Sequence, residues 1–251
     1  ATPRRADAVL LELAEEIVTR PRAPATDGRQ AGRITSQMDS HLRNFDEVVG
    51  LRVFDATGEL VESTNWADTP RFSVADRDYF RFLREQPSAG LFFSEAVVSR
   101  ATHRPSLIIA RALRTPDGAF LGVVTAVLDV SLYQEIFRSI DLGNNGAIAL
   151  RRSDDHRLVV RWPHVANEVN RPLNAEHPVR KAMSAGAGNG SLGFLAQSDG
   201  IDRIYSFRRL EHYPFYFVIG IARDDALAGW RTGAAVVGIS GLLLLTLLSV
   251  L

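Results

Sequence analysis

The last nineteen residues of the chain, 233–251, are uniformly apolar and carry no charged side chain. At 1.5 Å per residue, a helix of this length covers roughly 28 Å, close to the hydrocarbon thickness of a bilayer. Trp230 and Arg231 come directly before it, and residues of these types often lie at the membrane interface. The sequence therefore predicts a transmembrane helix over 233–251. The alternative interpretation of the same pattern is a buried core helix.

The rest of the chain has the composition of an ordinary folded protein. It carries 29 Lys and Arg residues against 29 Asp and Glu residues, in scattered positions, so its formal net charge is zero. This balance gives no indication of a nucleic-acid partner. The absence of cysteine excludes disulfides, cysteine-ligated zinc and thiol catalysis, and it is compatible with the bacterial periplasm. About 230 residues outside the apolar segment suffice for one large domain or two small ones.

The hydrophobic pattern predicts helices first and hairpins afterwards. Apolar residues recur with helical spacing over 9–18 and again over 30–47. From residue 48 the spacing becomes that of strands, and strand-like segments flank turns at Asp55–Gly58 and Thr115–Gly118. Because tight turns rather than helical crossovers join these strands, we expect antiparallel sheets and an α+β fold.

The hairpin pattern occurs twice along the chain. Matching segments lie about 95 to 99 positions apart, and Val48, for example, matches Ala147. This spacing suits one small domain per copy. The sequence therefore predicts two modules of similar topology, and the second continues into the apolar helix without a flexible linker.

Five segments, by their order and spacing, carry a resemblance to a known family. They are LRVFDATGELVEST, ADRDYF, IIARALRTPDGAFLGVVTAVLDVSLYQEIF, DLGNNGAIAL and YSFRRLEHYPFYFVIGIARDDALAGW. The chain resembles the double Cache (PDC-type) extracytoplasmic sensor domains of bacterial chemoreceptors, histidine kinases and diguanylate cyclases, and the resemblance covers essentially all of it. The family implies two tandem PAS-like modules after an N-terminal helical segment.

The resemblance implies a domain order and a role for each domain. The N-terminal helices occupy 1–47, a membrane-distal module with the ligand pocket occupies 48–140, and a membrane-proximal module that relays the signal occupies 141–229. The transmembrane helix follows at 233–251.

Amino-acid-binding members of the family carry a Tyr, then Arg-x-Trp-Tyr, a further Tyr and a late Asp. Arg77, Tyr79 and Phe80 match the central element, and Asp129 matches the late Asp. Arg71 stands where the first Tyr would be, and no Tyr lies between Tyr79 and Asp129. These departures bear on amino-acid specificity and leave the sensor assignment intact.

The expected ligand site combines guanidinium, aromatic and carboxylate groups. A guanidinium binds a carboxylate at two points, and an aromatic ring beside it covers apolar ligand surface. Two further arginines add positive charge near the same hairpin. The predicted site residues are Arg77, Tyr79, Phe80, Arg100, Arg111 and Asp129. Together they favour a small ligand that carries a carboxylate, with or without an amine, such as an amino acid or organic acid.

The same residues also allow structural interpretations. Asp76 could cap a helix that carries Phe80 and Phe82 into a core. Arg111 interrupts an apolar strand and needs an anionic partner or an exposed face, and Asp129 could be that partner.

Other motifs in the sequence carry less information. The run Gly188-x-Gly190-x-x-Gly193 matches a dinucleotide fingerprint but follows a helix and precedes a strand, so we expect a mobile loop. The turn containing Asp154, Asp155 and His156 is expected to be exposed to solvent. The six histidines show no metal-binding spacing, and no cofactor is expected.

The resulting hypothesis is a homodimeric sensor of the bacterial inner membrane, with residues 1–232 in the periplasm. A ligand in the distal module would shift the proximal module and, through the apolar helix, a cytoplasmic output domain such as a histidine kinase or a diguanylate cyclase. No catalytic motif is present, so this chain is not expected to be an enzyme. The alternatives are a ligand-free dimerisation or structural module and a tail-anchored enzyme.

Overall fold

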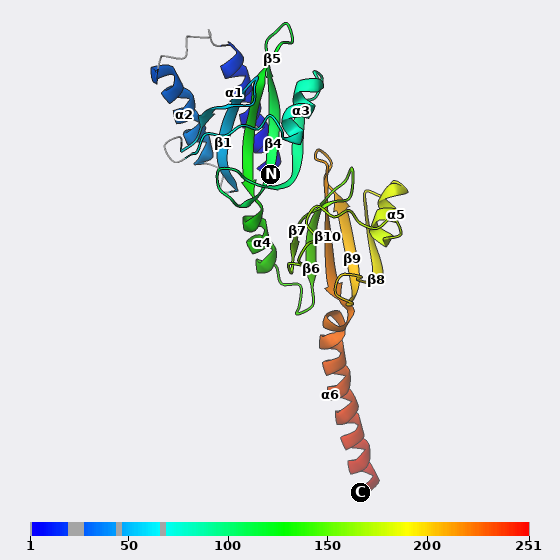
Figure 1. Ribbon diagram of the computed structural model, residues 1–251. Helices are drawn as coiled ribbons and strands as arrows, with labels where there is room; N and C mark the ends of the chain where they lie inside the picture. Colours follow the sequence, from blue (N-terminus) through cyan, green and yellow to red (C-terminus); the bar gives the residue numbers. More distant parts are fainter. Residues whose placement is uncertain (1, 20–27, 44–46, 66–68, 251) are drawn as a thin grey trace. The chain divides into compact units, whose positions relative to one another are not determined.

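The computed structural model describes residues 2–19, 28–43, 47–65 and 69–250. The chain divides into two compact units, residues 1–135 and 136–251, each built around an antiparallel sheet of five strands (Figure 1). The predicted α+β class with two antiparallel modules is therefore confirmed. The finer limits of the four predicted domains stay predictions.

The first unit has the strand order β2-β1-β5-β4-β3. Tight turns join β1 to β2 and β4 to β5, as the sequence predicts. The strands are β1 (Val48–Asp55), β2 (Leu60–Ser63), β3 (Leu91–Val98), β4 (Pro105–Arg114) and β5 (Phe120–Asp129). The helices are α1 (Thr2–Thr19), α2 (Gly28–Leu42), α3 (Asp78–Glu85) and α4 (Val130–Ser139), and α4 contains residues of both units.

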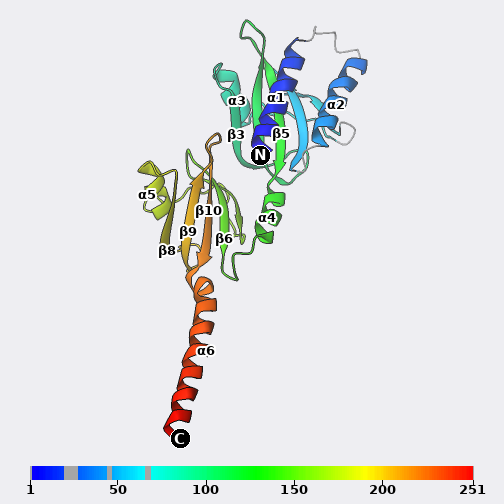
Figure 2. The ribbon, with the colours of Figure 1, turned by 180° about the vertical axis from the view of Figure 1, so that it is seen from behind.

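Helices cover both faces of the first sheet. On β4, Ala110 lies in the apolar cluster beneath α3, whereas Arg111 forms an ion pair with Asp7 of α1. Because successive residues of a strand point to opposite faces, α3 and α1 pack on opposite sides of the sheet. Figures 1 and 2 show α1 behind the strands in one view and in front of them in the other.

The second unit repeats the strand order of the first, as β7-β6-β10-β9-β8. The duplication predicted from the sequence is thus present in the topology. The elements are β6 (Ala147–Arg152), β7 (Leu158–Trp162), α5 (Pro178–Ser184), β8 (Asn189–Leu195), β9 (Asp202–Arg209), β10 (Phe215–Ala222) and α6 (Arg223–Val250).

Two local sequence predictions in the second unit are wrong. The glycine-rich run 188–193, predicted as a loop, forms most of edge strand β8, because it pairs with β9. Gly190 leaves room there for the ring of Phe207, which a Cβ would meet at 2.9 Å. His156, predicted to be exposed, is only 8% exposed, and its Nδ1 lies 3.1 Å from the Tyr216 hydroxyl. The hydrogen bond to a buried tyrosine explains why His156 is buried although it lies in a turn.

The last helix begins directly after β10 and is attached to the second unit at its start. Arg223 forms an ion pair with Asp202 on β9 at 2.9 Å, and the Asp225 carboxylate accepts a hydrogen bond from the Asn145 backbone N–H at 2.7 Å. No flexible linker separates β10 from α6, in agreement with the sequence.

Among the residues that the structure describes, no helix is both long and apolar enough to cross a membrane. The structure thus does not show the transmembrane helix predicted over 233–251. That prediction depends strongly on residue 251 and on the side chains of 242–245 and 247–250, which lie outside the described part of the chain.

Candidate functional site

A small cavity in the first unit contains three of the six predicted site residues. It has a volume of about 20 Å³ and lies between β1 and the start of α3. Arg77, Tyr79 and Arg100 line it, together with Arg52 of β1. Its remaining walls are largely apolar, and they come from Phe54, Phe72, Val74, Val97, Val98, Ile108 and Val127.

Arg52 is the residue of this site that sequence reasoning missed. It is 5% exposed, it has no carboxylate partner among the described residues, and its Nε has no hydrogen-bond partner. Removal from water lowers the pKa of this arginine. The signal that could have identified it is a cation inside the apolar strand segment VVGLRVF, the same signal that drew attention to Arg111. A buried guanidinium without a counter-charge strongly attracts an anion.

The other two arginines of the cavity are held by the surrounding chain. Arg100 makes two hydrogen bonds to Asp76, at 2.6 and 2.9 Å, and this contact lowers the pKa of Asp76 to about 2. Arg77 donates through Nη2 to the Val98 carbonyl at 3.3 Å. Tyr79 is buried, which raises the pKa of its hydroxyl.

The capping interpretation of Asp76 is wrong, because this carboxylate is engaged with Arg100. The N-cap position of α3 is Arg77, whose side chain makes no capping hydrogen bond. Phe82 is 43% exposed rather than buried in the core. Phe80 does lie in the core, at 0% exposure, where its ring packs edge-on against Phe120.

Arg111 and Asp129 do not line the cavity and do not pair with each other. Arg111 binds Asp7 of α1 at 2.5 Å. Asp129 lies 3.4 Å from Arg104 and accepts a hydrogen bond from the Ser131 N–H at the start of α4. The proposed Arg111–Asp129 pair is therefore wrong, because each residue meets a different partner.

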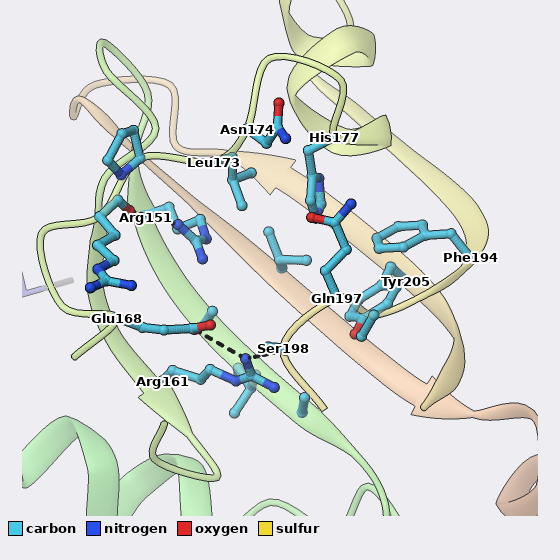
Figure 3. Close-up of a pocket in the computed structure, with 17 residues that line it drawn as sticks. Arg151, Arg161, Glu168, Leu173, Asn174, His177, Phe194, Gln197, Ser198 and Tyr205 are labelled. Carbon is cyan, nitrogen blue, oxygen red and sulfur yellow. Dashed lines mark hydrogen bonds and ion pairs between the residues drawn. The ribbon is translucent and has the colours of Figure 1, made fainter. Parts of the chain in front are cut away.

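The second unit contains a larger cavity of about 270 Å³ (Figure 3). It lies between the sheet and residues 168–177, which lead into α5. Ala147 and Ala149 of β6 and Val218 of β10 present small or apolar side chains to it. No candidate residue from the sequence analysis lies here.

Arg151 of β6 lines this cavity and forms no ion pair with a carboxylate among the described residues, although Glu168 is near enough to interact with it electrostatically. Its Nη1 donates to the backbone carbonyls of His156 and Arg171, at 3.1 and 3.3 Å. These contacts hold the guanidinium in place but do not neutralise it, and burial lowers the pKa of Arg151. Arg52 on β1 and Arg151 on β6 occupy corresponding strands, because each of these strands lies next to the edge strand in its sheet.

Aromatic rings form the wall on the side of β8 and β9 (Figure 3). Phe194 and Tyr205 stack with centroids 4.4 Å apart, and His177 meets Phe194 edge-on at 5.0 Å. The His177 Nδ1 accepts a hydrogen bond from the Val179 N–H at the start of α5, so the proton of the neutral ring is on Nε2. Burial, followed by the nearby Arg151 and His156, lowers the pKa of His177 to about 4.

Arg161 and Glu168, which also line the cavity, belong to a network of ion pairs. Arg161 contacts Glu168 at 3.3 Å and Asp199 at 2.9 Å, and it donates to the Ser198 hydroxyl at 2.8 Å (Figure 3). Both carboxylates are thus already engaged by arginine. Within the described part of the chain, no group of three His, Cys, Asp or Glu residues is placed to hold a metal ion.

Comparisons with known proteins agree with this architecture. The family model described as Cache domain matches residues 4–230. The extracellular domain of a protein described as a histidine kinase, rpHK1S-Z16, is 25% identical, with a TM-score of 0.76, and the match covers 91% of this chain and 90% of that one. No curated protein matches the chain in sequence.

Two chemoreceptor domains share the fold at lower identity. The ligand-binding domain of Pseudomonas fluorescens CtaA, in complex with L-isoleucine, is 18% identical with a TM-score of 0.60 over 88% of this chain and 85% of that one. The domain of Pseudomonas aeruginosa PAO1 PctB, in complex with L-Arg, is 21% identical with a TM-score of 0.61 over 88% of each chain. Because the family model covers most of the sequence, this chain belongs to the Cache domain family and is a double Cache sensor domain, a ligand-binding rather than enzymatic part of a receptor.

Proposed function

We propose that the chain senses a small molecule with a carboxylate group, and that this molecule binds in the first unit beside Arg52. The observation that carries the proposal is the burial of the Arg52 guanidinium without an acidic partner among the described residues. A buried uncompensated charge is unfavourable, and an anionic ligand would remove this cost. Arg77, Tyr79 and Arg100 line the same cavity and can share in binding.

Binding at this site requires the cavity to widen, because a volume of about 20 Å³ holds little more than one water molecule. The carboxylate of the exposed Asp76 side chain forms an ion pair with Arg100. A ligand carboxylate can replace Asp76 in this contact, so Arg100 can move without losing its ionic partner. A rearrangement that depends on the ligand is also what a sensor needs, since the ligand must favour one state over another.

The ligand class follows from the site and from the similar proteins. The similar domains of CtaA and PctB are in complex with L-isoleucine and L-Arg, and both ligands carry a carboxylate. The arginines of the first-unit cavity can bind a carboxylate. Because the sequence departs from the amino-acid motif, no residue is assigned to bind the amine of an amino acid. We therefore propose an amino acid or an organic acid.

The signal would pass through β10 into α6, which follow one another without a linker. We further propose that residues 233–251 anchor the chain in the bacterial inner membrane, with 1–232 in the periplasm and paired chains as the working unit. The uniform apolarity of that segment supports the anchor. In a bacterial host, the full chain should sediment with membranes after an alkaline wash, whereas a chain that ends at residue 232 should not. Release of the full chain would contradict the anchor.

The binding test is a thermal-shift screen of the 251-residue chain with the twenty L-amino acids and with acetate, succinate, malate and citrate. A compound at 100 times its Kd stabilises the folded chain by about 2.7 kcal/mol. Arg52→Met and Arg77→Ala should each weaken a hit, and Arg81→Ala, which removes an exposed arginine of α3, should not. The absence of any hit, or a hit that binds both variants with unchanged affinity, would contradict the proposal.

A further inference from the structure

The cavity of the second unit is large enough to hold a molecule. At about 270 Å³ it exceeds the roughly 150 Å³ of an engineered cavity that binds benzene. It is also close to the lower end of the range of typical ligand pockets. The first-unit cavity, by contrast, has room for little more than one water molecule.

The electrostatics of this cavity favour an anion. Arg151 is held by two backbone carbonyls and forms no ion pair with a carboxylate among the described residues. Arg171 also lines the cavity and is free of ion pairs within the same part of the chain. Glu168 contacts Arg161, so its charge is already compensated. The cavity therefore has an excess of positive charge, and no uncompensated carboxylate remains among its described lining residues to bind an ammonium group.

The rest of the lining favours an apolar ligand body. Phe194 and Tyr205 form a flat stacked surface, and the faces of β6 and β10 contribute Ala149 and Val218. Figure 3 shows Arg151 on the side opposite Phe194 and Tyr205. A ligand that spans the cavity would thus meet a cation at one end and aromatic carbon at the other.

We propose that the second unit holds a ligand site of its own, in which Arg151 binds the carboxylate of a small monocarboxylic acid whose apolar body lies against Phe194 and Tyr205. This site goes beyond the first-unit site and does not depend on it. Three arginines and a tyrosine line each cavity, but the two differ in size and in their apolar lining, because only the second has room for a ligand body beside a stacked aromatic pair.

The test is isothermal titration calorimetry on the 251-residue chain with phenylacetate and 4-methylpentanoate as probes. Phenylacetamide, which has the same body without the charge, is the matched ligand control. The acids should bind and the amide should bind at least about 30-fold more weakly, since loss of one partner of a buried charged contact costs 2 kcal/mol or more. Failure of both acids to bind the unmodified chain would overturn the proposal.

Four variants test where the acid binds. Arg151→Ala should weaken phenylacetate by at least about 30-fold, and Arg151→Lys should recover part of the loss because it keeps the charge without the two-point contact. Ala149→Leu should block binding by filling the cavity while leaving every arginine in place. Arg208→Ala, which removes an exposed arginine of the same unit outside the cavity, should bind phenylacetate as the unmodified chain does.

A first-unit variant separates this inference from the proposed function. Arg52→Met should leave phenylacetate binding unchanged. If Arg52→Met abolishes it while Arg151→Ala and Ala149→Leu do not, the acid binds in the first unit and the second site is disproved, while the proposed function stands. If Ala149→Leu alters the circular dichroism spectrum, the Arg151→Lys variant replaces it as the test. Phenylacetate binding by Arg151→Lys that equals binding by the unmodified chain would then overturn the proposal.

Discussion

The two units have the same strand order but differ in the space between the sheet and the helix that follows its first hairpin. In the first unit, β1 directs Arg52 and Phe54 at a cavity of about 20 Å³. In the second, β6 directs the smaller Ala147 and Ala149 at a cavity of about 270 Å³. The difference teaches that one duplicated strand order can enclose very different volumes.

Arg203 of the second unit is a buried arginine with a carboxylate partner, unlike Arg52 of the first unit, and this comparison gives the largest expected effect. Arg203 of β9 is 1% exposed and donates to both oxygens of Asp199, at 2.8 and 2.9 Å, and to the Asn145 carbonyl. Arg203→Met should lower the free energy of unfolding by about 3 kcal/mol, because it removes one partner of a buried ion pair. Urea unfolding measures this, with Arg208→Met as the exposed control. Equal stability of both variants would contradict the role of this network.

Filling the two cavities should have unequal consequences. Ala110 of β4 is fully buried beneath α3, so Ala110→Leu should destabilise the chain by about 1 to 3 kcal/mol through overpacking. Ala149→Leu places the same added volume in the open cavity and should change the free energy of unfolding by less than about 1 kcal/mol. The measurement is urea unfolding of both variants. If Ala149→Leu is as destabilising as Ala110→Leu, the second cavity is not open in solution.

Arg52→Met should act in the direction opposite to Arg203→Met. Because Arg52 lacks an acidic partner among the described residues, its replacement by an apolar side chain of similar length removes a desolvation cost. We expect a gain of about 1 to 2 kcal/mol in the free energy of unfolding, together with loss of ligand response. A loss of stability would show that the Arg52 guanidinium has a structural partner.

The smallest expected effect is the pH dependence that His177 gives to the second unit. The pKa of His177 falls from 6.5 to about 4 on folding. The unfolded chain therefore binds more protons between these values, so stability is full above about pH 6.5 and decreases as the pH falls towards 4. His177→Asn keeps a capping side chain. It should make the thermal unfolding temperature depend less on pH between pH 7 and pH 4.5. Part of the slope should remain, because burial also lowers the pKa of His156. An unchanged slope would mean that His177 does not titrate in this range.

The hairpins and their duplication could be predicted from the sequence because their signals are local. Alternating apolar residues and turns such as Asp55–Gly58 define a strand pair without reference to the rest of the chain. The edge strand β8 could not be predicted for the converse reason. In β8, Gly190 and Gly193 weaken the strand pattern, and pairing with β9 is what makes the segment extended.

The site was only partly predictable. Arg77, Tyr79 and Arg100 meet at one cavity as expected, but Phe80 is in the core and Arg111 pairs with Asp7, which is 104 positions away. A partner so distant in sequence cannot be inferred from spacing. Arg52, like Arg111, is a cation inside an apolar strand segment, but it has no acidic partner among the described residues. Only the packed structure distinguishes the two arginines.

The sequence by itself determined the α+β class, the two tandem modules and the family, because hydrophobic period, turn residues and segment order are properties of the chain alone. Tertiary structure decided which charges are compensated and where space remains, because both depend on side chains brought together from distant strands. Thus Arg52 and Arg151 emerge as open cations, and the larger cavity lies in the unit for which the sequence predicted no ligand site.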